Sequence, residues 1–295
     1  MTPTKAALVI NTASRRGRRL KQTAEKLLRE AGLDIESHPV SNPANLQSQV
    51  GGLIEKGFRL IIVGGGDGTI SEIVDQLVYK DVVLGILPLG TANSFVRSLD
   101  IPNHLPTAVA AIANGKVAEI DLGKINDTYF ANAVSLGFSS RVAANLPDNL
   151  KRYLGIFSYL VQGIRAMAHL RPFEVWFPGN NPVPFQTYQL VIANGGYYGP
   201  ASLIHKSRLE SADITIFTFK GLSPLQLLAI WMRALLGRRL SKQNLDRVVV
   251  EKELILETNP PQSVSLDGEV TTTTPIRISV APKALKVIVA ETSKL

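Results

Sequence analysis

The chain of 295 residues lacks cysteine, and it lacks any apolar run long enough to cross a bilayer. The absence of cysteine excludes disulfides and thiolate metal sites, and it fits a cytosolic protein. Without about 20 consecutive apolar residues, we expect no integral membrane protein. The four histidines share no metal-ligand spacing, so a zinc site is not predicted. The first residues carry no apolar segment with a cleavage site, so no signal peptide is predicted either.

Charged residues are few, at 19% against 45% hydrophobic residues, which is typical of a globular protein. The net charge is nevertheless +8, which favours a phosphorylated ligand, an anionic membrane surface or nucleic acid as a partner. No RRM aromatic signature or zinc finger is present, so a nucleic-acid partner is not predicted. Basic residues cluster at Arg15–Arg19 and at Arg233–Arg239, and each cluster alone is equally well explained as a solvated helix face.

Residues 6–120 alternate between strand and helix patterns. Strands are expected at 6–10, 34–41, 60–63 and 82–87, and helices at 18–31, 45–56, 70–77, 91–98 and 106–114. This alternation predicts an α/β domain with a parallel sheet, helices on both faces, and ligands at the carboxyl ends of the strands.

Strand patterns dominate residues 121–282, joined by Gly, Pro and Asn turns, which predicts an antiparallel β-sandwich. Strands are expected at 129–133, 174–177, 187–193, 214–219, 247–257, 263–266 and 276–281, and helices at 154–170 and 224–240. We therefore expect two domains, 1–120 and 121–282, with a ligand cleft between them.

The most informative stretch is Gly64–Thr69, which reads Gly-Gly-Gly-Asp-Gly-Thr between an apolar strand and a helix. Glycine lets backbone N–H groups approach an anion because no Cβ stands in the way. The following helix directs its positive end to the same place. Asp67 is then a carboxylate among phosphate-binding groups, where it can hold Mg²⁺. Nucleotide binding is the favoured interpretation, and a turn that only joins strand to helix is the alternative.

A second loop, residues 88–95, repeats the order of strand, glycine turn and helix start. Thr91 or Ser94 can cap that helix, and Asn93 is short enough to bond a ligand. Capping alone also explains these polar residues. The loop after the first strand, residues 11–16, offers cationic side chains to phosphates. Loops of this kind at the ends of adjacent strands favour a binding site.

A third block, Leu266-Asp267-Gly268-Glu269, lies between strands, and Asp-Gly is a common hairpin pair. Together with residues 65–69 and 88–93, this block resembles the diacylglycerol kinase catalytic-domain family. That family includes soluble bacterial lipid kinases and is related to sphingosine and ceramide kinases. Residues 121–123, 130–138 and 194–199 also resemble family blocks in the expected order, so the resemblance covers nearly the whole chain.

The resemblance implies an enzyme that transfers phosphate from ATP, with Mg²⁺, to a hydroxyl of diacylglycerol or a related lipid. It implies a cytoplasmic protein in peripheral contact with an anionic membrane surface, and a return of residues 283–295 to the first domain. Asp67, Asp121 and Glu269 are implied to be catalytic, with Glu269 as the general base for the lipid hydroxyl. The implied metal-binding residues are Asp67, Asp121, Glu210 and Asp213. The implied ATP-binding residues are Asn11, Arg15, Gly64, Gly65, Gly66, Gly68, Thr69, Gly90, Thr91, Asn93, Asp267 and Gly268.

Three segments depart from the family pattern. Ser94 stands where the family has an acidic residue, residues 11–15 replace its Asn-Pro-x-Ser-Gly opening, and its Asp-Gly pair is missing from 208–213. A regulatory protein that binds nucleotide or lipid with weak catalysis is therefore one alternative. An NAD kinase is the other, because NAD kinases share the Gly-Gly-Asp-Gly-Thr motif. The helices at 154–170 and 224–240 either pack on the sandwich or dock on anionic lipid. The oligomeric state is left open, a homodimer included.

Overall fold

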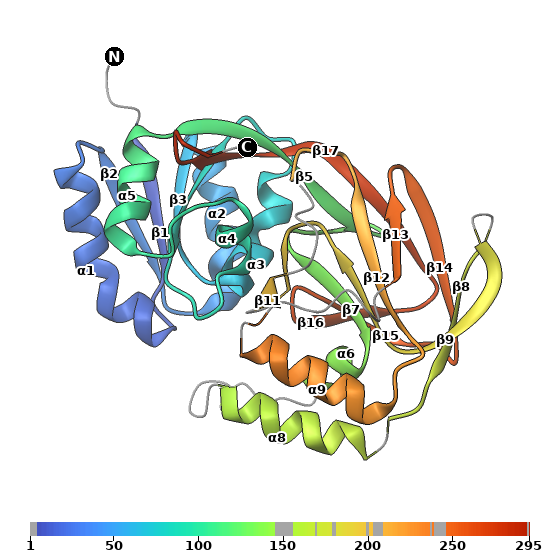
Figure 1. Ribbon diagram of the computed structural model, residues 1–295. Helices are drawn as coiled ribbons and strands as arrows, with labels where there is room; N and C mark the ends of the chain where they lie inside the picture. The colour runs from blue at the N-terminus through green and yellow to red at the C-terminus, as the bar shows by residue number, and fades with distance from the viewer. Residues whose placement is uncertain are drawn as a thin grey trace. The chain divides into compact units, whose positions relative to one another are not determined.

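The computed structural model describes residues 5–144, 156–168, 170–178, 181–198, 201–202, 209–236, 238, 246–293 and 295 (Figure 1). The chain forms two compact units. The first comprises Met1–Leu122, Arg208–Ser211 and Ala281–Leu295, and the second comprises Gly123–Ser207 and Ala212–Val280. Strands β5 (Lys116–Ile125) and β17 (Ile276–Val289) each contribute residues to both units.

The first unit is built on a sheet with the strand order β17-β4-β3-β1-β2, in which every neighbouring pair is parallel. The remaining strands are β1 (Ala6–Asn11), β2 (Ile35–Val40), β3 (Leu60–Gly65) and β4 (Val83–Pro88). Their apolar side chains are almost fully buried, as expected for a parallel sheet covered on both faces. The predicted α/β fold of this part is confirmed.

The helices of the first unit are α1 (Arg15–Glu30), α2 (Leu46–Glu55), α3 (Asp67–Leu77), α4 (Ser94–Ser98) and α5 (Leu105–Asn114), with a 3-10 turn at Pro43–Asn45. Along the sheet, the chain moves one way from β1 to β2 and the other way from β2 to β3 to β4. Right-handed crossovers therefore place α1 on one face and α2 and α3 on the other. Helix α5 packs against α1, and α2 packs against α3 (Figure 1).

The C-terminal strand closes the first unit's sheet. Lys286 and Val287 of β17 pair in parallel with Val83 and Leu84 of β4. Lys286 Nζ also lies 2.7 Å from Asp81 Oδ1, and this hydrogen bond raises the pKa of Lys286 and lowers the pKa of Asp81. The end of β17, up to Val289, thus belongs to this sheet, in the segment for which the resemblance implies a return to the first domain.

The second unit is a sandwich of antiparallel strands. Its strands are β6 (Thr128–Phe130), β7 (Ala133–Gly137), β8 (Phe173–Phe177), β9 (Asn181–Ala193), β12 (Ile214–Lys220), β13 (Asp246–Val250), β14 (Glu253–Asn259), β15 (Ser263–Leu266) and β16 (Glu269–Thr273), with a small hairpin of β10 (Tyr197–Tyr198) and β11 (Ala201–Ser202). The predicted sandwich is confirmed.

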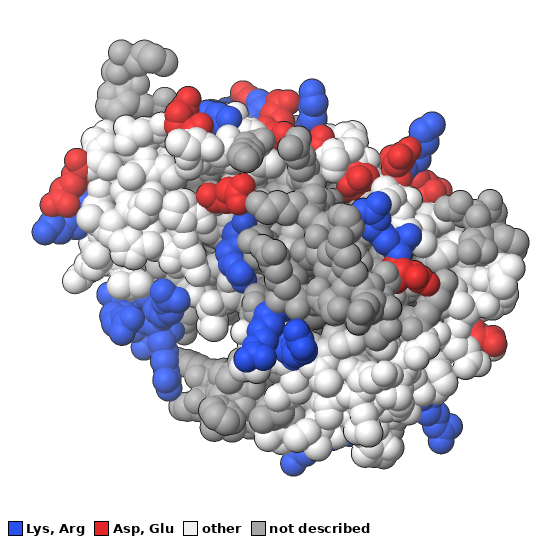
Figure 2. Space-filling view, viewed as in Figure 1, with Lys and Arg blue, Asp and Glu red and all other residues white. Residues whose placement is uncertain are grey.

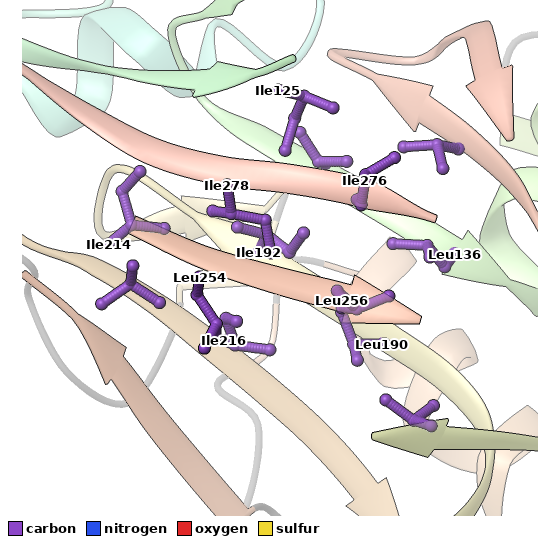
Figure 3. Packing of buried hydrophobic residues seen from close by; sticks show 14 of the residues in the cluster. Ile125, Leu136, Leu190, Ile192, Ile214, Ile216, Leu254, Leu256, Ile276 and Ile278 are labelled. Carbon is purple, nitrogen blue, oxygen red and sulfur yellow. The ribbon is translucent and has the colours of Figure 1, made fainter. Parts of the chain in front are cut away.

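The core of the second unit is made of aliphatic side chains that point between the strands (Figure 3). Alternate residues of β9 face in opposite directions, so Leu190 and Ile192 lie in this core. Val191 and Ala193 lie instead in a second apolar cluster, together with Trp231. The central strands are therefore buried on both faces.

In the part of the second unit that the structure describes, the helices are α6 (Phe138–Ala144), α8 (Ile156–Met167) and α9 (Pro224–Leu235). Helix α8 packs against α6 and α9. Gly163 on α8 makes room for the Trp231 ring, because a Cβ there would stand 2.3 Å from it. Trp231 also meets Phe138 edge to face, with 5.3 Å between ring centroids. Among the described residues, no helix is both long and apolar enough to span a membrane.

The structure corrects several boundaries. The strand expected at 247–257 is two strands, β13 and β14, because the charged pair Glu251-Lys252 forms a bend and the two halves pair with different strands. The strand expected at 276–281 is part of a longer strand, β17, which continues through Lys283 at φ 48 to Val289. The expected strand at 129–133 is divided between β6 and β7. The last residues of the helix expected at 224–240 lie outside the described residues.

Candidate functional site

The first unit carries three loops at one edge of its sheet. They follow β1, β3 and β4, which are adjacent and parallel, so their carboxyl ends lie side by side. The register places Gly64 beside Ile10 on one neighbour and Leu87 on the other. The structure thus brings the residues expected to bind ATP at 11–15, 64–69 and 90–93 to the same edge.

The glycine loop touches the loop after β4 through backbone atoms. A Cβ on Gly90 would stand 2.4 Å from Gly66 Cα, and a Cβ on Gly66 would stand 2.9 Å from Gly90 Cα. Real Cβ atoms essentially never come so close to a backbone atom. Both positions therefore require glycine so that the two loops can meet.

The other glycines of the loop divide into two kinds. A Cβ on Gly65 would lie 2.4 Å from the Thr69 side chain, and one on Gly64 would lie 2.9 Å from Leu89. These two glycines are explained by close packing within the protein. Gly68 is exposed, and a Cβ there would meet no protein atom within 4 Å. Packing within the protein therefore does not explain why residue 68 is a glycine. The close approach of a ligand to this position would explain it.

Asn93 holds the loop after β4 in place. It is fully buried and adopts a left-handed conformation, with φ 47 and ψ 49. Its Oδ1 accepts the N–H of Gly90 at 3.0 Å, and its Nδ2 donates to Gly90 O at 3.1 Å and to Asn103 Oδ1 at 2.7 Å. Asn93 is also the N-cap of α4, so the expectation that Thr91 or Ser94 caps this helix is wrong. Asn93 can adopt the left-handed backbone conformation because its short side-chain amide forms hydrogen bonds within its own loop.

Asp67 connects the glycine loop to α4. It is the first residue of α3, where a carboxylate is favoured by the positive end of the helix. Its Oδ1 accepts the backbone N–H of Phe95 at 3.0 Å. The side chain is half-buried. Asp67 thus stands among backbone N–H groups at the edge of the sheet.

This edge of the sheet offers Mg²⁺ the carboxylate of Asp67. Among the described residues, no group of three or more His, Cys, Asp or Glu side chains is close enough to hold a metal ion. Magnesium in nucleotide sites needs only one or two carboxylates, because phosphate oxygens and water complete its coordination. Asp67 fits that requirement, and an all-protein cage built from Asp67, Asp121, Glu210 and Asp213 is not found in the part of the chain that the structure describes.

The loop after β1 faces the glycine loop through Asn11. Its Nδ2 donates to Thr69 Oγ1 at 3.2 Å, and its Oδ1 accepts the N–H of Ala13 at 3.1 Å. Ser14 is the N-cap of α1 and accepts the Gly17 N–H at 2.9 Å, which explains why this helix begins earlier than residue 18. Asn11 therefore positions both its own loop and Thr69.

Arg16 belongs to the loop that was expected to offer cationic side chains to phosphates, but it was not among the residues expected to bind ATP. Its Nη1 donates to Gly90 O at 2.6 Å, which ties the start of α1 to the loop after β4. The two residues are 74 positions apart, so only the sheet order brings them together. Arg15 and Thr91, which were expected at the ATP site, are both exposed.

Asp121 is buried within the first unit, with 3% of its surface exposed. Its Oδ1 accepts the backbone N–H of Lys283 at 2.8 Å, and its own N–H donates to Leu209 O at 2.6 Å. These bonds hold three distant segments of the unit together. Glu210 follows Leu209 and is exposed, and Asp213 belongs to the second unit.

The second unit carries the remaining candidate block, at the hairpin between β15 and β16. Leu266 pairs with Glu269, so Asp267 and Gly268 form a two-residue loop with φ of 46 and 103. Positive φ at both positions is the type I′ geometry that Asp-Gly favours. The hairpin interpretation of this block is therefore confirmed, and Glu269 stands exposed at the start of β16.

Asp267 also fastens this hairpin to a neighbouring segment. Its Oδ2 accepts the N–H of Ala131 at 3.0 Å, and its Oδ1 accepts those of Asn132 and Ala133 at 3.1 and 3.0 Å. Its own N–H donates to Ala133 O at 3.0 Å. Hydrogen bonds from three backbone N–H groups to one charged carboxylate are strong, so they hold the two segments together. The structure gives Asp267 a positioning role beside Glu269.

Comparison with known proteins identifies the class. Residues 5–125 match the diacylglycerol kinase catalytic domain, and residues 132–289 match the YegS C-terminal NAD kinase beta sandwich-like domain. A protein of Enterobacter sp. (strain 638) named "probable lipid kinase YegS-like" is 32% identical over 294 residues, which cover 95% of this chain and 94% of that protein. A "probable lipid kinase YegS" of Salmonella arizonae is also 32% identical, with the same coverage.

Solved structures share the fold. A diacylglycerol kinase from Bacillus anthracis superposes with a TM-score of 0.75 at 19% identity, covering 99% of both chains. An NAD kinase from Archaeoglobus fulgidus in complex with ATP superposes with a TM-score of 0.52 at 12% identity. At such identities the likeness concerns the fold alone.

The chain therefore belongs to the YegS-like lipid kinase family, and it is a kinase with a diacylglycerol kinase catalytic domain. The resemblance predicted from the glycine loop and the two later blocks is confirmed.

Proposed function

We propose that this protein transfers the γ-phosphate of ATP to a hydroxyl of diacylglycerol or a related lipid. The observation that carries the proposal is the meeting of Gly66 and Gly90, which joins two loops beside Asp67 at the carboxyl edge of a parallel sheet. Such edges bind nucleotides because backbone N–H groups and a helix N-terminus face the phosphates. The family match supports the kinase chemistry.

The phosphates of ATP would lie against Gly68, where the space next to Cα is open. Phosphoryl transfer depends mostly on positioning and on neutralising charge. In this chain the positioning falls to the loops held by Asn93, Asn11 and Arg16. Mg²⁺ held by Asp67 would neutralise charge on the phosphates when ATP is bound. Each of these residues acts by fixing a loop or by accepting and donating hydrogen bonds.

Glu269 of the second unit is proposed to take the proton of the lipid hydroxyl. It is exposed at the end of the Asp267-Gly268 turn, so its carboxylate is accessible to a substrate. The bonds from Asp267 to Ala131, Asn132 and Ala133 hold that turn rigid. A base held in place in this way raises the rate more than a mobile one.

The lipid substrate implies work at a membrane surface. Helices α8 and α9 expose large apolar side chains: Ile164 is 57% exposed, Leu225 77% and Leu236 62%. Arg165 and Arg233 lie on the same two helices. We infer that this face contacts anionic lipid peripherally, with apolar side chains entering the interface and arginines at the headgroups. Arg239, expected to take part, lies outside the described residues.

A labelled-ATP assay over several acceptors tests the function. The parent protein should transfer label to diacylglycerol or a related lipid, and an Asp67→Asn protein should not. The NAD kinase alternative rests on the fold likeness and predicts labelled NAD instead. The regulatory alternative rests on Ser94, which is a buried serine where the family has an acid, and predicts ATP binding without any product. Labelled NAD, or no labelled product, contradicts the proposal.

A further inference from the structure

The beginning of α1 carries an unusual charge. Arg15, Arg16, Arg18 and Arg19 are four of its first five residues, and its first turn contains no acid. The N-terminus of a helix is already positive, so cations there are unfavourable and acids are the usual choice. Residues that are unfavourable for the local structure, such as arginines at the positive end of a helix, are expected at functional sites. Of these four arginines, the function proposed above uses only Arg16.

The four arginines lie on one side of the helix. Successive residues turn by about 100°, so the four side chains span an arc of about 160° centred opposite Gly17. Gly17 is the buried position, because a Cβ there would stand 2.0 Å from Asn11 O. The helix is therefore pressed onto the loop after β1 at Gly17, and the four arginines start from the remaining positions around its first turn. All four are exposed, and we name them the arginine fan.

The two lysines of α1 each lie beside a glutamate one turn further along the helix. Lys21 lies 3.4 Å from Glu25, and Lys26 lies 3.7 Å from Glu30. Within the chain as far as the structure describes it, no carboxylate lies within 4.0 Å of Arg18 or Arg19. In Figure 2, basic side chains gather over the lower end of α1, where the helix begins. The charge of the fan is thus concentrated at one end of α1, on residues that are exposed to solvent.

Arg16 and Arg18 of the fan are held by hydrogen bonds to protein carbonyls. Arg16 donates to Gly90 O at 2.6 Å, and Arg18 Nε donates to Thr12 O at 3.3 Å. A bond to a carbonyl fixes a guanidinium without neutralising it. The fan is therefore partly ordered before any partner arrives, which lowers the entropy cost of binding.

We propose that the arginine fan docks the first unit on an anionic lipid surface. The four arginines spread over a wider area than a single phosphate group can contact. Several basic side chains spread in this way can contact many anionic headgroups of a membrane surface at once. Guanidinium groups bond phosphate in the forked geometry that lysine lacks. This inference rests on the proposed function for its biological sense, since a lipid kinase meets its substrate at a membrane. The fan would supply a salt-sensitive part of that contact.

The test compares two double variants in vesicle sedimentation without ATP. The vesicles are phosphatidylcholine with or without phosphatidylglycerol, at low and high salt. Arg18→Gln with Arg19→Gln removes two charges from the fan. Lys21→Gln with Lys26→Gln removes two charges from the same helix outside it and is the matched control. Arg18→Lys with Arg19→Lys keeps the charge. Thermal unfolding checks that each variant folds.

The fan variant should bind phosphatidylglycerol vesicles roughly 30-fold more weakly than the parent at low salt, as expected for two basic residues at a membrane surface. The control should bind like the parent, and the lysine variant should recover most of the binding. Parental binding by the fan variant overturns the proposal, as does an equal loss in the control. Preference of the parent for a short RNA over the vesicles also overturns it. Because no ATP is present, a failed kinase assay would leave this result standing.

Discussion

The carboxylate of Asp67 accepts the backbone N–H of Phe95 at 3.0 Å, which links the glycine loop after β3 to the helix after β4. This bond gives Asp67 a structural contact in addition to its proposed part in catalysis. The two contributions can be separated by the choice of substitution.

Asp67→Asn should lower the turnover rate by about 10²–10³-fold. Its unfolding temperature should stay near that of the parent. The amide oxygen can still accept from Phe95, but the charge that would hold Mg²⁺ is lost. Asp67→Ala should be inactive as well and should also lose about 1 kcal/mol of stability, because the Phe95 N–H loses its partner. Kinase assays and thermal unfolding of both variants check this. Full activity in Asp67→Asn would remove the charge from the mechanism.

Gly68→Ala and Gly90→Ala should affect different properties, ATP affinity in the first variant and stability in the second. The added methyl at position 68 meets no protein atom within 4 Å, so stability should hold while ATP binds about tenfold more weakly. The added methyl at position 90 meets Gly66 Cα at 2.4 Å and should cost about 1–3 kcal/mol of stability. Nucleotide titration and denaturant unfolding measure the two quantities. Unchanged ATP affinity in Gly68→Ala would show that no ligand uses that space.

Asp267→Ala should destabilise the second unit by about 2–4 kcal/mol, because three backbone N–H groups lose a charged acceptor. Asp267→Asn keeps one acceptor oxygen and should cost less. Urea unfolding of both proteins gives the comparison. An Asp267→Ala protein as stable as the parent would mean that these bonds contribute nothing to stability.

Replacing Arg233, Arg238 and Arg239 by Gln should weaken sedimentation with anionic vesicles and reduce its dependence on salt. Each basic residue near such a surface contributes about 1 kcal/mol. Leu225→Ser, at a side chain 77% exposed, should weaken binding without changing the salt dependence. If the triple variant sediments as well as the parent, α9 is only a packing element.

The sequence was sufficient for the sheet of the first unit. Continuous apolar runs such as Leu60–Val63 are typical of strands buried on both faces, and the glycine loop marks where one of them ends. Helix starts were less predictable, because α1 begins at Arg15 through a cap at Ser14 rather than through its apolar pattern.

The contacts that hold the site together could not be predicted. Asp-Gly at 267–268 predicts a turn, but the amides that Asp267 binds lie over 130 positions away. The bond from Arg16 to Gly90 likewise depends on the strand order. Helix α6 was missed because it is short and follows Gly137, whose φ of 86 is visible only in the folded chain.

The most direct test of the account is a single turnover of bound, labelled ATP in the presence of diacylglycerol vesicles, for the parent and for Glu269→Gln. Glutamine keeps the size of the side chain but is a far weaker base, so lipid labelling should slow by about 10²–10⁴-fold. ATP affinity should stay unchanged, because the proposed ATP contacts are on the first unit. The account predicts labelled lipid from the parent and this large loss in the variant. Labelling at the parental rate by Glu269→Gln, or no labelled lipid from the parent, would contradict it.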